Sequence, residues 1–77
     1  MKYVIFQTGE TVLFAESVTH AFVAGSRPVR SAGFCVLETN RNRFDEIRAK
    51  AICYGGSDSL GVTSRPEDAE YISAMWI

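Results

Sequence analysis

The side chains best suited to catalysis are one histidine, His20, and two cysteines, Cys35 and Cys53. A thiolate acts as a nucleophile when a neighbouring base activates it, so an enzyme built on this sequence would need a thiol or a carboxylate beside His20. Both cysteines lie in apolar stretches, and free cysteine is among the most buried residue types. We therefore favour reduced thiols packed in the core, and the sequence leaves open a disulfide between them. We expect His20 to be a surface or half-buried residue of a short helix.

These side chains are too few for a metal centre. Zinc sites use closely spaced pairs of ligands, whereas 17 residues separate the two cysteines and the chain has one histidine. The glycine-rich stretch 54–61 lacks the lysine of a phosphate-binding loop, so we interpret it as a hairpin turn. We interpret Glu67 and Asp68 as solvated carboxylates that cap a helix. The sequence thus predicts no catalytic residue, no metal and no cofactor, and a chain that is not an enzyme.

A basic cluster in the middle of the chain is the one group of side chains that suggests binding. Its members are Arg41, Arg43, Arg48 and Lys50. Strands and their loops present such side chains to phosphates, and Tyr54 would add a stacking ring if it is exposed. The net charge of the whole chain is −1, however, and acidic neighbours partly cancel the cluster. We favour a solvated, charged hairpin and keep nucleic-acid binding as the alternative function.

Hydrophobic patterning and turn residues predict the elements that would position these side chains. In order, they are strands at 2–7 and 11–15, a short helix at 17–25, strands at 29–39, 44–54 and 59–63, and a C-terminal helix that follows a capping box at 64–67. The predicted fold is α+β, with the order β-β-α-β-β-β-α. We expect one domain over residues 1–77, with a single small antiparallel sheet and both helices on one of its faces.

Three details of this prediction concern the short helix, the central hairpin and the C-terminal helix. We expect Ser17 to cap the short helix, with Phe22 on its apolar side and Gly25 at its end. Residues 40–43 are a polar break, so a tight hairpin would place Phe34 opposite Ala49 and Val36 opposite Ile47. That register would make the face carrying Phe34 and Val36 the dry face of the sheet. In the C-terminal helix we expect Ala69, Ile72 and Trp76 to form the apolar side.

Composition bounds the cellular setting. With 47% hydrophobic and 22% charged residues, the chain is typical of a folded globular protein. Its first residues do not resemble a signal peptide, and no apolar run approaches the ~20 residues that span a membrane. We expect a cytoplasmic protein that does not bind membranes.

The remaining surface features suggest contacts with other protein chains. A small sheet has unpaired edge strands, which can pair with a second copy or with a foreign peptide. Trp76 and Ile77 either close the core, which we favour, or form an apolar patch that contacts a partner. We therefore expect a non-enzymatic interaction or regulatory module that self-associates as a homodimer.

Two segments, Met1–Phe6 and Ser59–Glu70, resemble short uncharacterised proteins of bacteria and their phages. The resemblance implies an intracellular bacterial or phage origin. It transfers no functional residue, because the shared features are a strand and a capped helix.

Overall fold

The computed structural model describes residues 1–41 and 47–74, and side chains over 1–38 and 50–74. The elements are β1 (Lys2–Phe6), β2 (Thr11–Phe14), α1 (His20–Ala24), β3 (Val29–Arg41), β4 (Ile47–Tyr54), β5 (Gly56–Ser57), β6 (Val62–Thr63) and α2 (Asp68–Ala74). The predicted α+β class and the predicted order of elements are confirmed, with β5 as an additional two-residue strand. No helix within the described residues is long and apolar enough to cross a membrane.

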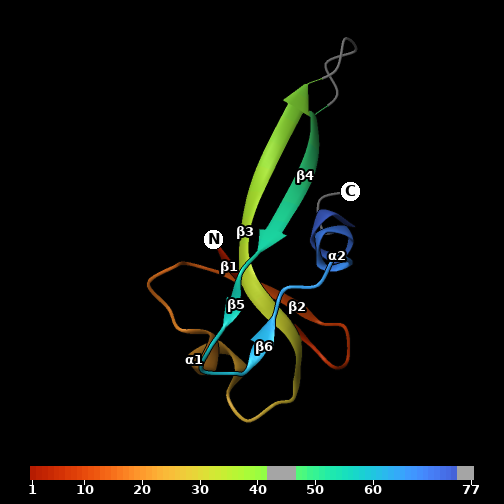
Figure 1. Cartoon of the computed structure of the whole chain (residues 1–77). Helices are drawn as coiled ribbons and strands as arrows, with labels where there is room; N and C mark the ends of the chain where they lie inside the picture. The colour runs from red at the N-terminus through yellow and green to blue at the C-terminus, as the bar shows by residue number, and fades with distance from the viewer. Residues whose placement is uncertain (42–46, 75–77) are drawn as a thin grey trace.

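Four antiparallel strands form the main sheet in the order β2-β1-β3-β4. The two longest strands, β3 and β4, form a hairpin that projects beyond the rest of the molecule (Figure 1). The strand predicted at 59–63 is shorter than expected, at Val62–Thr63, and it pairs with β5 in a separate two-stranded sheet. Gly61 has a φ of 68°, a conformation that ends the turn between these two short strands.

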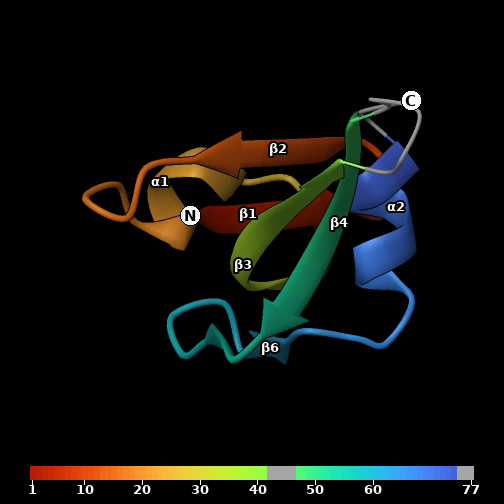
Figure 2. The same cartoon turned by 90° about the horizontal axis from the view of Figure 1, so that it is seen from above.

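The sheet is covered on both faces. Tyr3 and Val4 are consecutive and fully buried, so their side chains enter different layers. Tyr3 packs in a cluster with Ile72 of α2. Val4 packs instead with Ala24 of α1 and with Leu60 and Val62 of residues 56–63, the segment from β5 to β6 that we call the β5–β6 arm. The prediction that both helices lie on one face is therefore wrong, as Figures 1 and 2 show. A strand buried on both sides is uniformly apolar, and its sequence does not reveal which layer lies where.

The register of the β3–β4 hairpin also differs from the prediction. Phe34 pairs with Tyr54 and Cys35 pairs with Cys53, because β3 continues through the expected break to Arg41 and β4 begins at Ile47. This shift places the β3 residues that were predicted to be dry on the outer face, while the predicted dry side of β4 stays in the core. Cys35 and Ala51 belong to the core under α2, while the face of Phe34 is the outer one. Apolar residues occupy both faces of this hairpin, so hydrophobicity did not fix the register.

Helix α1 is short and starts later than predicted. Its N-cap is Thr19 rather than Ser17: the Thr19 hydroxyl accepts a hydrogen bond from the Phe22 amide at 3.1 Å. Gly25 ends the helix, as predicted, with a φ of 58°. The buried side chains are His20 and Ala24, whereas Phe22 is 81% exposed, contrary to the predicted apolar stripe. These two buried residues are four positions apart, so they lie on the same side of the helix.

Candidate interaction surface

One side of the β3–β4 hairpin is a strip of six side chains that we call the hairpin face. It consists of Phe34, Val36, Glu38, Lys50, Ile52 and Tyr54. These residues form three directly opposed cross-strand pairs, Phe34 with Tyr54, Val36 with Ile52 and Glu38 with Lys50. They alternate with the residues that pack under α2, as the two-residue period of a strand requires.

The middle of the hairpin face is apolar and exposed. The exposed fractions are 49% for Val36, 41% for Ile52 and 49% for Tyr54. The Phe34 and Tyr54 rings stack with their centroids 5.7 Å apart. Single exposed apolar residues are common on monomers, but a contiguous patch marks a surface suited to binding.

Charged groups flank this apolar strip. Glu38 and Lys50 are exposed and face each other across the two strands, towards the tip of the hairpin. At the other end, the Lys2 Nζ lies 5.8 Å from the centroid of the Phe34 ring. The strip is thus a bounded apolar surface with an acid on β3 and a base on β4.

The fold leaves this strip bare because the covering elements end before it. On this side of the sheet, α1 and the β5–β6 arm pack around Val4, Phe6 and Ala32, which lie in β1 and the start of β3. The hairpin projects past them (Figure 1). Helix α2 lies against the opposite side of the hairpin, where the Ser73 hydroxyl accepts a hydrogen bond from the Ala51 amide at 3.1 Å.

His20 is a core residue and not the surface or half-buried histidine that we predicted. It is 6% exposed, and its Nε2 lies 2.9 Å from the Gly33 carbonyl oxygen. The Phe14 and Phe34 rings pack against it edge to face, with centroids 5.5 and 5.8 Å away. These contacts put His20 on the side of the sheet that carries the hairpin face, away from Cys35 and Cys53. The chain therefore does not bring the histidine and a thiol together.

The two cysteines face each other across β3 and β4. Both are free; Cys35 is fully buried and Cys53 is partly buried in the same cluster. Burial raises the pKa of the Cys35 thiol. Burial, with smaller contributions from Cys35 and Asp68, raises the pKa of the Cys53 thiol to about 11. The predicted burial is confirmed for Cys35 and holds in part for Cys53.

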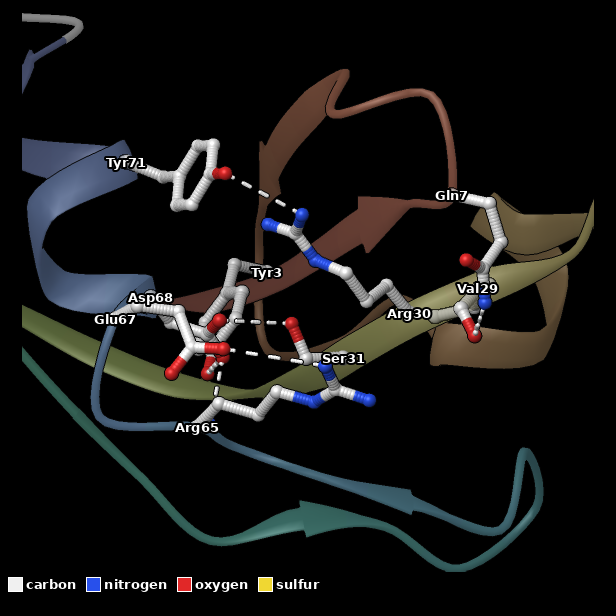
Figure 3. A network of polar contacts seen from close by, with 9 residues as sticks. All are labelled: Tyr3, Gln7, Val29, Arg30, Ser31, Arg65, Glu67, Asp68 and Tyr71. Atoms are coloured by element: carbon white, nitrogen blue, oxygen red, sulfur yellow. Dashed lines mark hydrogen bonds and ion pairs between the residues drawn. The ribbon is translucent and has the colours of Figure 1, made fainter.

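A buried polar network joins α2 to the sheet (Figure 3). Asp68 is fully buried, although the sequence predicted a solvated carboxylate. It accepts hydrogen bonds from the Tyr3 hydroxyl at 2.5 Å, the Ser31 hydroxyl at 2.8 Å and the Arg65 amide at 2.9 Å. Burial, followed by the hydrogen bond to Asp68, raises the pKa of Tyr3. Glu67, the other member of the predicted pair, is exposed as expected.

Arg30 extends this contact between the sheet and α2. Ile5 pairs with Ser31 and Phe6 with Val29, so Arg30 is the extra residue of a β-bulge, which re-aims its side chain. Its guanidinium lies over the Tyr71 ring at 4.5 Å and donates to the Tyr71 hydroxyl at 3.3 Å (Figure 3). The Asp68 carboxylate and its three donors satisfy one another, whereas the buried Nε and Nη2 of Arg30 have no hydrogen-bond partner among the described residues. We interpret the network as an anchor for α2.

The predicted basic cluster is described only in part. Lys50 is exposed and lies on the hairpin face. Arg41 pairs with Ile47 and Arg48 with Asn40, so both belong to the hairpin. Their side chains lie outside the described part of the structure, as do the whole of Arg43, Trp76 and Ile77.

The remaining chemical expectations concern metals and phosphates. Within residues 1–41 and 47–74, no three histidine, cysteine or acidic side chains gather where they could hold a metal ion. The glycine-rich stretch forms β5, a turn and β6, as predicted. In that turn the Ser57 hydroxyl accepts a hydrogen bond from the Leu60 amide at 3.4 Å, so this polar group is used locally.

Comparison with known proteins gives no relative. No family model matches the chain, and neither the curated proteins nor the solved structures provide a significant match.

Proposed function

We propose that this chain is a non-enzymatic protein-interaction module that self-associates through its hairpin face. The observation that carries the proposal is the contiguous apolar strip formed by Val36, Ile52 and Tyr54, which no helix within the described residues covers. Covering such a strip with a second apolar surface removes it from water, which is the main driving force of protein association.

The register of the hairpin favours a second copy as the partner. If a two-fold axis runs parallel to the strands between two facing hairpins, each β3 lies over the β4 of the other copy. Because Glu38 and Lys50 are directly opposed within one chain, this symmetry sets Glu38 of each copy over Lys50 of the other. It also sets Val36 over Ile52. The face is thus self-complementary in both charge and apolar character.

The size of the strip limits the strength of such a dimer. Burying a half-exposed apolar side chain contributes roughly 1 kcal/mol, so three from each copy contribute on the order of 6 kcal/mol. Loss of rigid-body freedom opposes association. The ~6 kcal/mol alone would correspond to a Kd of about 40 µM, and the opposing cost weakens the dimer further, so we expect a Kd of roughly 0.1 mM to a few mM.

Size-exclusion chromatography with light scattering, run over this concentration range in a reducing buffer, tests the proposal. We expect the average mass of the wild-type chain to rise towards that of a dimer. Ile52→Lys should keep the chain monomeric, because it puts a charge in the apolar strip. Phe22→Ser is the matched control: Phe22 is even more exposed but lies on α1, so its replacement should leave association unchanged. A wild-type monomer at all concentrations, or equal effects of the two variants, would contradict the proposal.

Nucleic-acid binding is the second candidate function. Its specific support is Tyr54, which is exposed and shares the hairpin face with Lys50, so that a stacking ring and a cation lie on one surface. Fluorescence anisotropy with a single-stranded oligonucleotide tests it. Binding through this surface should weaken steeply with added salt and on Lys50→Glu. Binding that is insensitive to salt would exclude it.

The proposal includes a cytoplasmic setting, supported by the two free cysteines. Neighbouring cysteines that do not form a disulfide are typical of proteins in reducing compartments.

A further inference from the structure

The backbone hydrogen bonds around the two cysteines define the type of cross-strand pair that they form. In an antiparallel pair of strands, opposed residues alternate between those that exchange backbone hydrogen bonds and those that do not. The Cys35 amide donates to the Met1 carbonyl at 2.8 Å, on the β1 side of β3, and so points away from β4. Cys35 and Cys53 are therefore a non-hydrogen-bonded pair.

The neighbouring pair gives the same result independently. The Ala51 amide donates to the Ser73 hydroxyl of α2 at 3.1 Å, so it too points out of the β3–β4 ladder. Ala51 is opposed to Leu37, two residues along from the cysteine pair, and positions two residues apart in a strand have the same type. Both strands thus assign Cys35 and Cys53 to the class of pair in which opposed side chains approach most closely.

This class of pair fits the geometry of a disulfide. Non-hydrogen-bonded partners have Cα atoms about 4.5 Å apart, which lies within the range of about 4.4–6.8 Å that disulfides span. Both side chains point to the same side of the sheet, into the cluster beneath α2. A bond between the two sulfurs therefore needs no change of register and no movement of one strand past the other.

We propose that Cys35 and Cys53 are an oxidisable dithiol that closes to a cross-strand disulfide in the presence of a small peroxide. Cys53 reacts first, because it is partly exposed whereas Cys35 is fully buried. Its thiolate attacks one peroxide oxygen, the O–O bond breaks, and the products are a sulfenic acid and hydroxide. Cys35 then attacks the Cys53 sulfur and displaces the sulfenic oxygen as water. In total, two thiols and one hydrogen peroxide give one disulfide and two water molecules.

The environment of the thiols makes this reaction slow at neutral pH. Burial disfavours the thiolate, and the pKa of Cys53 is raised to about 11. Below that pH the thiolate fraction, and with it the rate of the first step, should rise about tenfold per pH unit. The pair is therefore suited to sustained oxidant exposure rather than to rapid turnover.

Closure would join β3 to β4 beneath α2 and constrain the unfolded chain. The ring would enclose the 17 residues between the two cysteines, so the oxidised form should melt at a temperature higher by on the order of 10 °C. The hairpin face lies on the other side of the sheet, so this inference does not depend on the proposed function.

The test is oxidation of the folded wild-type chain with excess hydrogen peroxide at pH 8, followed by denaturation, alkylation and mass spectrometry. We expect a monomer that is lighter by two hydrogen atoms, takes up no alkylating agent and recovers both thiols on reduction. The rate should be lower, by more than tenfold, at pH 7 than at pH 8.5.

Two variants test the order of the steps. In Cys35→Ala, peroxide should leave Cys53 as a sulfenic acid that dimedone traps; in Cys53→Ala, Cys35 should remain reduced in the folded chain. Wild type oxidised in urea provides the comparison that does not depend on the variants' stability. The inference is overturned if the folded chain yields disulfide-linked dimers or sulfonic acids instead, or if the intramolecular disulfide forms only in urea.

Discussion

Asp68 links three parts of the chain that are distant in sequence. Its carboxylate accepts hydrogen bonds from β1 through Tyr3, from β3 through Ser31 and from the segment before α2 through the Arg65 amide. A buried carboxylate without such donors would be strongly destabilising. Together with the burial of Ile72 and the Ser73–Ala51 hydrogen bond, this carboxylate holds α2 on the sheet.

Replacing Asp68 should accordingly cost much more stability than replacing its exposed neighbour. We expect Asp68→Ala to lower the free energy of unfolding by about 3 kcal/mol, because it leaves the Tyr3 and Ser31 hydroxyls and the Arg65 amide without their acceptor. Glu67→Ala is the matched control and should change stability by no more than about 0.5 kcal/mol. Urea denaturation measures both. Similar effects of the two variants would show that the network does not anchor α2.

The raised pKa values of Cys53 and Tyr3 should make the fold less stable in alkali. In the unfolded chain Cys53 titrates near its ordinary pKa of 9.0, and in the fold at about 11. The stability that accompanies the neutral thiol is thus fully present below pH 9 and is lost as the pH rises to 11. Tyr3, whose pKa is also raised, extends the loss to higher pH.

Melting temperatures measured from pH 7 to pH 11 should therefore be constant to about pH 9 and then fall. Cys53→Ser is the control, because it removes the thiol and should reduce the fall between pH 9 and 11. A wild-type curve that is flat over this interval would contradict the assigned burial of Cys53.

At the scale of elements, the hairpin shows what could and could not be predicted from the sequence. The two strands and the element order follow from β-branched and apolar runs separated by polar or glycine-rich breaks. The register does not, because Phe34 and Val36 on one face are as apolar as Cys35 and Leu37 on the other. The β3 residues of the predicted dry face, Phe34 and Val36, consequently lie on the exposed face, whereas on β4 Ala51 packs in the core as predicted. The sequence shows apolar residues on both sides of this hairpin, but it does not show which side the helices cover.

The buried polar residues were missed for a related reason. Aspartate is usually exposed and histidine is intermediate in burial, and both His20 and Asp68 are buried beside hydrogen-bond partners that are distant in sequence. Gly33 supplies the acceptor for His20, and Tyr3 and Ser31 supply donors for Asp68. Such partners are brought together by the tertiary fold, and no local pattern reports them.

The charged ends of the hairpin face should determine which copies pair. Glu38→Lys and Lys50→Glu should each weaken the homodimer, since like charges then meet across the two-fold axis. An equimolar mixture of the two variants should form mixed dimers several-fold more readily than either homodimer, because opposite charges meet again at both positions. Repulsion between residues 38 and 50 of the same chain is present in homodimers and mixed dimers alike, so it cannot produce that preference.

Native mass spectrometry of the mixture measures this preference, with the same mixture at high salt as the control. Salt screens exposed charges and should abolish the excess of mixed dimers. A statistical distribution at low salt would reject the proposed axis, even if the chain dimerises.

At the scale of the whole molecule, the fold has three layers with an incomplete third. Helix α2 covers one side of the sheet, and α1 with the β5–β6 arm covers part of the other. A domain of 77 residues has few elements with which to cover a long hairpin, and small domains bury a smaller fraction of their surface than large ones. The hairpin face is therefore a consequence of the architecture, and a second copy of the chain is the cover that we propose for it.

The most direct test of self-association through the hairpin face is an isotope-filtered NMR experiment on an equal mixture of labelled and unlabelled chains at about 1 mM. We expect intermolecular nuclear Overhauser contacts between the methyl groups of Val36 in one copy and Ile52 in the other, and between the rings of Phe34 and Tyr54. Intermolecular contacts from the β2 edge in place of these, or a chain that is wholly monomeric at this concentration, would contradict the account.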